Sequence, residues 1–161
     1  MCDKMTFELY HEIIRVKAAE YDIPTDIIYG VCMAESCLNR YAVRYEPKYR
    51  YLCCPEQLKP SDCSLETEIS LQKTSWGIMQ VMGGLARSLG FRGWLTELVC
   101  SPLTQIDLGC QYLSGQIKRY GENDGIAAYN TGKPRYSDGV YVNQAYYDRV
   151  LKYAKRWTYE N

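Results

Sequence analysis

One carboxylate stands out in this sequence because it lies among apolar residues. Between Ile27 and Asn39 the only formally charged side chain is Glu35, four residues after Val31 and therefore on the same side of a helix. Burial disfavours the charged form of a carboxyl group and raises its pKa, so that the group stays protonated near neutral pH and can act as a general acid. The alternative is that Glu35 lies near a helix end and reaches solvent or a partner such as Arg40. The pattern leaves both interpretations open.

Periodic apolar residues predict the helices that would position Glu35. The segment from Thr25 to about Leu38, which carries this glutamate, is apolar almost all round and should be central in the fold. Between Pro102 and Tyr120 an apolar stripe repeats at helical spacing, with proline at its start and Gly121 after its end. Further helices are expected over Thr6–Tyr21, Gln80–Leu89 and Val140–Trp157, the first with an apolar side that includes Leu9, Ile13 and Val16.

The segment from Tyr45 to about Thr74 differs in composition from the rest of the chain. It is rich in Tyr, Pro, Lys, Cys and Glu, and three prolines would interrupt any long element, namely Pro47, Pro55 and Pro60. We expect an irregular or small β insertion around residues 45–75, with either a short strand or a short helix in it. No repeat or interdomain linker is visible, so the sequence predicts a single compact, mainly α domain over residues 1–161, with about seven helices.

Composition excludes several classes of protein. Of 161 residues, 47% are apolar and 24% are charged, which is ordinary for a globular protein. Nineteen basic residues balance nineteen acidic ones without a block of like charge, which argues against nucleic acid as the main partner. The longest stretch without a charged residue, Thr74 to Ala86, is far shorter than the roughly 20 residues that span a bilayer, so we expect no membrane insertion.

The contents of tyrosine and cysteine are unusual. Sixteen tyrosines against two phenylalanines suit a groove that binds sugars or other polar polymers, although a core that prefers tyrosine explains any one of them equally well. Eight cysteines could form a disulfide framework, but Cys32 and Cys110 fall on apolar helical stripes, which favours reduced structural thiols. No Cys-x-x-Cys occurs, and the single histidine, His11, is far from any cysteine cluster, so we expect neither a metal nor a cofactor.

Four short motifs follow one another along the chain. They are Glu-Ser-Cys-Leu-Asn-Arg-Tyr-Ala-Val at 35–43, Trp-Gly-Ile-Met-Gln at 76–80, Ala-Ala-Tyr-Asn-Thr-Gly at 127–132 and Tyr-Tyr-Asp-Arg-Val at 146–150. In this order they resemble the motifs of the soluble lytic transglycosylase family, which has a lysozyme-like α+β fold. The resemblance covers roughly residues 23–153, and four ordered motifs are far more specific than one.

The chain departs from the family pattern in two places. The insertion lengthens a connection that is usually short in the family, so substrate contacts there do not carry over. Trp76 stands before the motif glycine, where the family often has small residues. It would be either a sugar-stacking platform at the edge of the groove or a buried tryptophan.

The resemblance implies roles for individual residues. By position Glu35 would be the catalytic acid and base. The side chains that would line the glycan groove around it are Ser36, Gln80, Tyr129, Asn130 and Tyr146. Four of these have structural alternatives: Ser36 as a hydroxyl at a helix end, Gln80 in the first turn of a helix, Asn130 as a helix cap and Tyr146 as a core side chain.

The lack of a second carboxylate in these motifs bears on the reaction. Common glycosidase routes need two carboxylates, and goose-type lysozymes, which resemble this pattern, carry an aspartate where this chain has Met82. We therefore expect a peptidoglycan-cleaving lytic transglycosylase that breaks the β-1,4 bond between N-acetylmuramic acid and N-acetylglucosamine and forms 1,6-anhydromuramic acid. A muramidase stays open as an alternative, because the insertion offers five possible second carboxylates: Glu46, Glu56, Asp62, Glu66 and Glu68.

Two further functions stay open as well. A non-catalytic glycan-binding or assembly protein would keep the groove without turnover, and a cysteine hydrolase would need His11 as its base. The N-terminus, Met-Cys-Asp-Lys-Met-Thr-Phe-Glu, mixes both signs of charge and builds no apolar run typical of a secretory signal. We expect a monomer, made in the cytoplasm, that acts on peptidoglycan strands after release by a phage holin, as an endolysin does, or as part of a virion or secretion machine.

Overall fold

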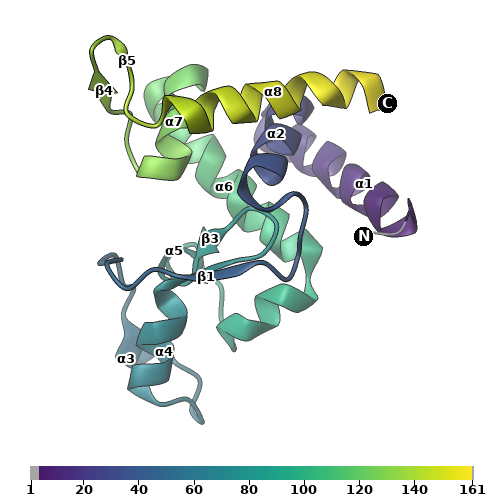
Figure 1. Ribbon diagram of the computed structural model, residues 1–161. Coiled ribbons are helices and arrows are strands. Elements are labelled where there is room, and N and C mark those ends of the chain that lie inside the picture. Colours follow the sequence, from purple (N-terminus) through teal and green to yellow (C-terminus); the bar gives the residue numbers. More distant parts are fainter. Residues whose placement is uncertain (1–3, 161) are drawn as a thin grey trace.

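Helices dominate the computed structural model of the protein, which describes residues 4–160 (Figure 1). The long helices are α1 (Lys4–Tyr21), α2 (Thr25–Ser36), α6 (Pro102–Tyr120), α7 (Glu122–Thr131) and α8 (Gln144–Glu160). The shorter ones are α3 (Pro55–Leu58), α4 (Leu65–Gln72), α5 (Gly83–Ser88) and the 3-10 helix η1 (Leu95–Cys100). Strands β1 (Val43–Tyr45), β2 (Thr74–Trp76) and β3 (Val81–Met82) form an antiparallel sheet in that order, and β4 (Tyr136–Ser137) pairs with β5 (Val140–Tyr141). This arrangement confirms the predicted mainly α fold class.

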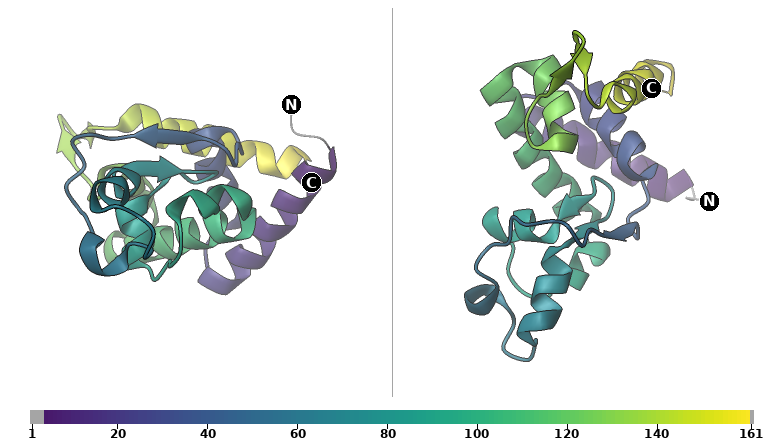
Figure 2. Two further views of the ribbon diagram at one scale, coloured as in Figure 1. Left: turned by 90° about the horizontal axis from the view of Figure 1, so that it is seen from below. Right: turned by 60° about the vertical axis from the view of Figure 1, so that its left-hand side comes forward.

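The elements form two lobes that α6 connects (Figures 1 and 2). In the upper lobe of Figure 1, α2 packs against α8, while α6 packs against both α7 and α1. The lower lobe holds the three-stranded sheet with α3, α4 and α5, and α4 contacts both α5 and β2. The first turn of α1 and the last turn of α8 lie on the same side of the molecule (Figure 1).

Helix α2 is central, as its apolar sequence predicts. Ile28, Val31 and Cys32 are fully buried, and Gly30 lies so close to α8 that a Cβ atom there would be 2.5 Å from the carbonyl oxygen of Val150. The close approach of the two helices therefore requires glycine at this position. It brings Tyr146, one turn before Val150, near the C-terminal end of α2, where Glu35 lies.

The buried side of α1 differs from the predicted one. Leu9 and Val16 are 53% and 51% exposed, whereas Tyr10, Ile14 and Ala18 are buried. Helical spacing alone is compatible with either set of residues as the buried side of α1. The buried set is the one that faces α2 and α6.

Two predicted helix starts were wrong because local strand pairing replaces the first turn. Helix α5 begins at Gly83 and not at Gln80, since Gln80 has a φ of 49° and Val81 pairs with Trp76. Helix α8 begins at Gln144 and not at Val140, since Asp138 and Gly139 have φ values of 53° and 80° and close the β4–β5 hairpin. Asp-Gly is the dipeptide that a two-residue hairpin turn favours, so this signal was present in the sequence.

The insertion contains two short helices, where the sequence had left open a short strand or a short helix. Its β structure is confined to its two ends, where β1 pairs with β2 in the register Val43 to Trp76, and α3 and α4 occupy the interior. The Ser64 hydroxyl accepts a hydrogen bond from the Thr67 amide and so caps the N-terminus of α4. Serine at this position is an N-cap signal that was present in the sequence.

Candidate active site

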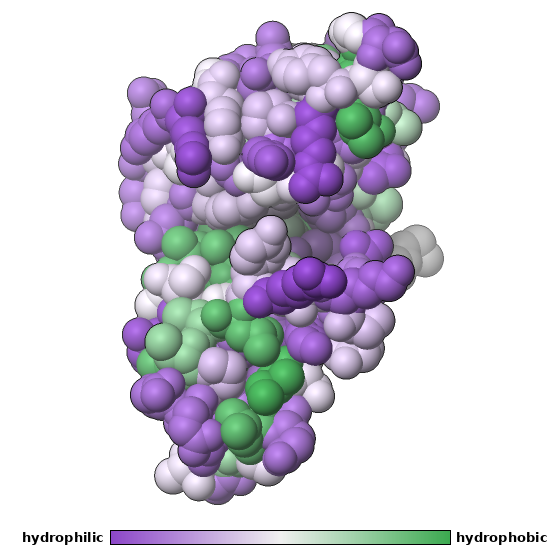
Figure 3. Space-filling view, turned by 90° about the vertical axis from the view of Figure 1, so that its left-hand side faces the viewer, coloured by the Kyte–Doolittle hydropathy of each residue, from purple (hydrophilic) through white to green (hydrophobic). Residues whose placement is uncertain are grey.

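A cleft of about 740 Å³ lies between the two lobes. The upper lobe contributes the end of α2, one side of α6 and the end of α7 with the loop that follows it, and the lower lobe contributes residues from β1 to α5. Figure 3 looks onto the open side of the molecule, where a hollow crosses the middle between a mostly hydrophilic upper lobe and a lower lobe with apolar patches. Of the six predicted site residues, four line this cleft: Glu35, Gln80, Tyr129 and Asn130.

Glu35 lies at the end of α2, with its carboxyl group partly buried in the wall of the cleft. Helix α2 ends directly after it, because Cys37 and Leu38 adopt the left-handed conformation. Desolvation by burial raises the pKa of Glu35 to about 6, against smaller opposing effects of the Tyr146 hydroxyl, Arg44 and Arg149. A carboxyl group with this pKa is a suitable general acid near neutral pH.

The alternative partner for Glu35, Arg40, is engaged elsewhere. Its guanidinium group donates hydrogen bonds to the carbonyl oxygens of Val99 and Cys100 at 2.9 Å each. Glu35 therefore faces the cleft and does not form a structural ion pair with Arg40.

Two buried tyrosines lie beside the Glu35 carboxyl group. Tyr146 on α8 is 5% exposed, and its buried hydroxyl, which forms no hydrogen bond within the described residues, lies near the carboxyl group and lowers its pKa. Tyr129 on α7 is also buried, and its hydroxyl donates to the carbonyl oxygen of Met79 at 2.8 Å. Burial, with the nearby Glu35 charge as a second cause, raises the pKa of both tyrosines well above the usual value. Both hydroxyls are therefore neutral donors over the whole physiological pH range.

Ser36 connects α2 to the lower lobe and does not line the cleft. Its hydroxyl donates to the carbonyl oxygen of Ile78 at 2.8 Å and accepts from the amide of Asn39 at 3.1 Å. The geometry matches the structural alternative for this residue, a hydroxyl at a helix end, and gives it the further task of holding the 76–80 motif against Glu35.

Gln80 lines the cleft and also holds the sheet together. Its side-chain amide donates to the carbonyl oxygens of Ala42 and Gly77 at 3.0 and 2.8 Å, and its carbonyl oxygen accepts from the Ser75 hydroxyl at 2.8 Å. Three bonds from one side chain fix the tight turn between β2 and β3. Gln80 is not in the first turn of a helix, so that alternative was wrong.

Asn130 is exposed in the penultimate position of α7, with its side chain at the cleft. Its carbonyl oxygen accepts a hydrogen bond from the Asn143 side chain at 3.3 Å. The helix ends at Gly132 in the left-handed conformation, so Asn130 is not the cap.

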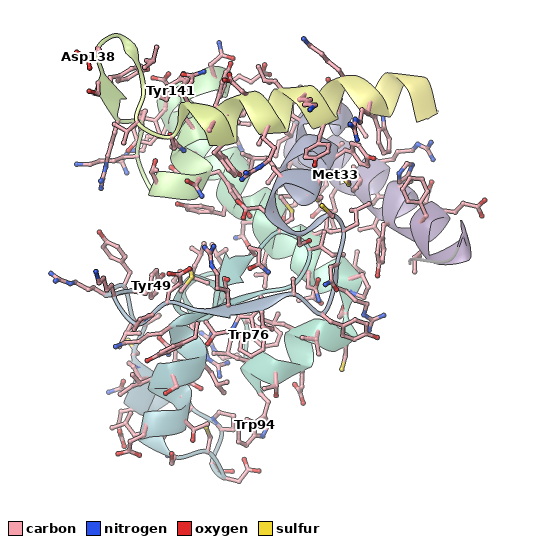
Figure 4. All side chains as sticks on the ribbon, viewed as in Figure 1. Met33, Tyr49, Trp76, Trp94, Asp138 and Tyr141 are labelled. Atoms are coloured by element: carbon pink, nitrogen blue, oxygen red, sulfur yellow. The ribbon has the colours of Figure 1, made fainter. Side chains whose placement is uncertain are left out.

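Trp76 lies inside the lower lobe and not at the edge of the groove (Figure 4). It is 6% exposed, and its indole N–H donates to the carbonyl oxygen of Leu71 at 3.1 Å. Trp76 is therefore a buried tryptophan and not a sugar-stacking platform.

Among the acidic residues of the insertion, Glu46 is the one that lines the cleft, where it forms an ion pair with Arg44. Glu68 is fully buried and binds Arg87 through both of its carboxylate oxygens, at 2.8 and 2.9 Å. The other three, Glu56, Asp62 and Glu66, are exposed and do not line the cleft. Met82, by contrast, does line it, and its thioether cannot activate water.

Sequence reasoning missed several residues that line the cleft, namely three tyrosines and two basic residues. The insertion contributes Tyr49 and Tyr51, α6 contributes Tyr112, and the loop after α7 contributes Lys133 and Arg135. In the sequence only the excess of tyrosine indicated such a surface, without showing which tyrosines form it.

Other chemistry has less support in the described part of the chain. The seven cysteines between residues 4 and 160 are free thiols, and no three His, Cys, Asp or Glu side chains in this range come together as metal ligands would. His11 is buried on α1 in contact with the rings of Phe7, Tyr29 and Trp157, so it does not lie in the cleft. None of the described helices is both long and apolar enough to cross a membrane.

Comparison with known proteins gives one match. Residues 12–146 match the model of the family described as the transglycosylase SLT domain. No curated protein and no solved structure matches the chain. The matched range includes Glu35 and every residue that lines the cleft.

Proposed function

Because the chain belongs to the transglycosylase SLT domain family, whose activity is peptidoglycan lytic transglycosylation, we propose that it cleaves the β-1,4 bond between N-acetylmuramic acid and N-acetylglucosamine with formation of 1,6-anhydromuramic acid. The observation that carries this proposal is the partly buried Glu35 carboxyl group in the cleft, with a pKa of about 6. One such group can donate a proton and then accept another.

In the first step the protonated Glu35 donates its proton to the glycosidic oxygen, and the bond from this oxygen to C1 of the muramic acid breaks. The carboxylate that forms is stabilised by the Tyr146 hydroxyl and by the positive charges of Arg44 and Arg149, which all lower the pKa of Glu35. Burial opposes that ionisation, and the balance keeps the carboxyl group able to exist in both forms near neutral pH.

In the second step the Glu35 carboxylate accepts the proton of the 6-hydroxyl group of the same muramic acid. The oxygen of that hydroxyl forms a bond to C1, which closes the 1,6-anhydro ring. Glu35 ends the cycle protonated, and no water is consumed. General acid and base catalysis of this kind contributes roughly a hundred- to ten-thousand-fold to a rate.

The remaining predicted residues would position the sugar. Asn130 and Gln80 line the groove, and Gln80 also holds the β2–β3 turn. Tyr129 and Ser36 tie the backbone of residues 78–79 to α7 and α2, because their hydroxyls bind the carbonyl oxygens of Met79 and Ile78. Ser36 would act through the structure of the motif, whereas Tyr129 also lines the cleft.

The test is the chemistry of the product. Purified peptidoglycan is digested with the protein, and the fragments are analysed by mass spectrometry. Transglycosylation yields fragments lighter by one water than those of a hydrolase, ending in 1,6-anhydromuramic acid, with no new reducing ends. A digest dominated by reducing ends would refute the proposal.

A muramidase is the second candidate, and the position of Glu46 in the same cleft as Glu35 is the observation that favours it. A hydrolase needs a second carboxylate as nucleophile or as base for water. Glu46 could serve only if its ion pair with Arg44 left one oxygen available. The variant Glu46→Gln separates the two: a muramidase would lose its activity, whereas the transglycosylase would still form anhydro products.

A further inference from the structure

Four tyrosines form a row along the cleft. The rings of Tyr51 and Tyr49 meet edge to face with centroids 5.7 Å apart, and those of Tyr112 and Tyr129 lie 5.2 Å apart. All four line the cleft, and Tyr49 in turn lies close enough to Tyr112 for the two hydroxyls to influence one another. The row therefore runs from beside Glu35 to the insertion, where Figure 4 shows Tyr49 on the lower wall below α7.

The outer end of this row is open to solvent. Tyr51 is 80% exposed, the highest value among the exposed large apolar side chains of the described residues. Its ring packs edge to face against the ring of Tyr49. A tyrosine ring offers a flat apolar surface and loses little conformational entropy when it binds a partner. Such a ring in a cleft is suited to the apolar face of a sugar.

Buried polar groups hold the loop that carries Tyr51. The amide group of Gln72 accepts from the Cys53 backbone N–H at 2.7 Å and donates to the Cys53 carbonyl oxygen at 3.0 Å. Gln72 is itself bound to Glu68, which forms the buried ion pair with Arg87. Fully satisfied buried networks of this kind hold one conformation.

Close packing adds to this anchor. A Cβ atom at Gly84 would lie 2.5 Å from the carbonyl oxygen of Tyr51 and 3.1 Å from the ring of Tyr49, so the loop lies directly on α5. The exposed ring of Tyr51 is thus presented by a rigid support and not by a loose loop. Preorganised aromatic groups lose less free energy on binding than mobile ones.

We propose that Tyr49 and Tyr51 form an additional sugar subsite, in which Tyr51 stacks on a pyranose ring of the glycan strand at a distance from the bond that Glu35 cleaves. The inference rests on the proposed function for the identity of the strand. Its consequence is a dependence on chain length: long strands reach the subsite, and short fragments held at Glu35 do not.

The experiment measures binding without cleavage. In the Glu35→Gln background, titration calorimetry compares glycan strands freed of their stem peptides with a tetrasaccharide of the same repeat. We expect Tyr51→Ala to weaken the binding of long strands by about tenfold and that of the tetrasaccharide by less than about twofold. Tyr51→Phe keeps the ring and should bind long strands like the parent. The matched control is Tyr41→Ala, which removes a ring that is 65% exposed and does not line the cleft.

The results separate this inference from the proposed function. Equal binding of long strands by Tyr51→Ala and the parent would overturn the subsite, as would an equal loss in Tyr41→Ala or an equal loss for the tetrasaccharide. Because Tyr51 is exposed, its substitution does not threaten folding, and a thermal unfolding curve verifies this. The proposed function fails instead if wild-type digests lack anhydro products, an outcome that leaves the calorimetric comparison intact.

Discussion

Replacing Glu35 by glutamine is expected to abolish activity and to stabilise the fold at neutral pH. Burial raises the pKa of Glu35 from 4.5 to about 6 in the folded protein. Between these values the folded state holds a proton that the unfolded state has released. The free energy of unfolding therefore falls as the pH rises through this window, and above pH 6 the protein bears the full cost of a partly buried carboxylate. Glutamine keeps the shape and removes the charge.

The size of the effect follows from the shift in pKa. At 1.36 kcal/mol per unit the shift corresponds to about 2 kcal/mol, and we expect about 1 kcal/mol because the carboxyl group borders the solvent-filled cleft. Relative to the wild type, Glu35→Gln should therefore be more stable by about 1 kcal/mol at pH 7.5 and equally stable at pH 4. The rate of peptidoglycan lysis should fall by at least a hundredfold.

The assay is urea unfolding of both proteins at pH 4 and pH 7.5, combined with a turbidity assay of wall lysis. Glu56→Gln, which removes an exposed glutamate outside the cleft, controls for the loss of one negative charge. If Glu35→Gln were no more stable than the wild type at pH 7.5, burial would not be the cause of the raised pKa. If well-folded Glu35→Gln retained more than a small residual rate, Glu35 would not be the catalytic group.

Three other substitutions, one of them with a matched control, test the supports of the site. Asn130→Ala should lower turnover up to about a hundredfold with little change in melting temperature, because a sugar misplaced by ~1 Å reacts far more slowly. If turnover fell only together with a marked fall in melting temperature, the role of Asn130 would be structural. Arg87→Met should cost about 3–5 kcal/mol in urea unfolding, since it leaves the Glu68 carboxylate buried without its cation. Gly84→Ala should weaken long-strand binding by displacing Tyr51, whereas Gly115→Ala, where a Cβ atom meets nothing within 4 Å, should not.

The sequence was sufficient for the features that local patterns determine. The stripe between Pro102 and Tyr120 predicted α6 to the residue, because its proline and Gly121 fix both ends of the helix. The apolar run around Glu35 predicted a central helix, and α2 is central. The order of four motifs, over roughly residues 23–153, predicted the family whose model matches residues 12–146.

Local patterns failed where a segment pairs with another part of the chain. Val140 and Tyr141 fit a helical stripe, yet they join a hairpin, because the Asp138-Gly139 turn brings Tyr136 and Ser137 alongside. Leu9 and Val16 fit an apolar side that no other element covers. In both cases the partner that decides the outcome is not encoded in the pattern of the segment itself.

The surroundings of Glu35 in the cleft were decided by tertiary structure. The sequence singled out Glu35 by its type and its surroundings, but whether it met Arg40 or a cleft depended on where the carbonyl oxygens of Val99 and Cys100 lie. Likewise, five acidic residues of the insertion were equivalent in sequence, and folding buried Glu68 against Arg87, left three exposed and brought Glu46 to the cleft. Residue types determine which chemistry is available, whereas proximity and desolvation, which set the pKa of a carboxyl group, arise only when distant segments pack together.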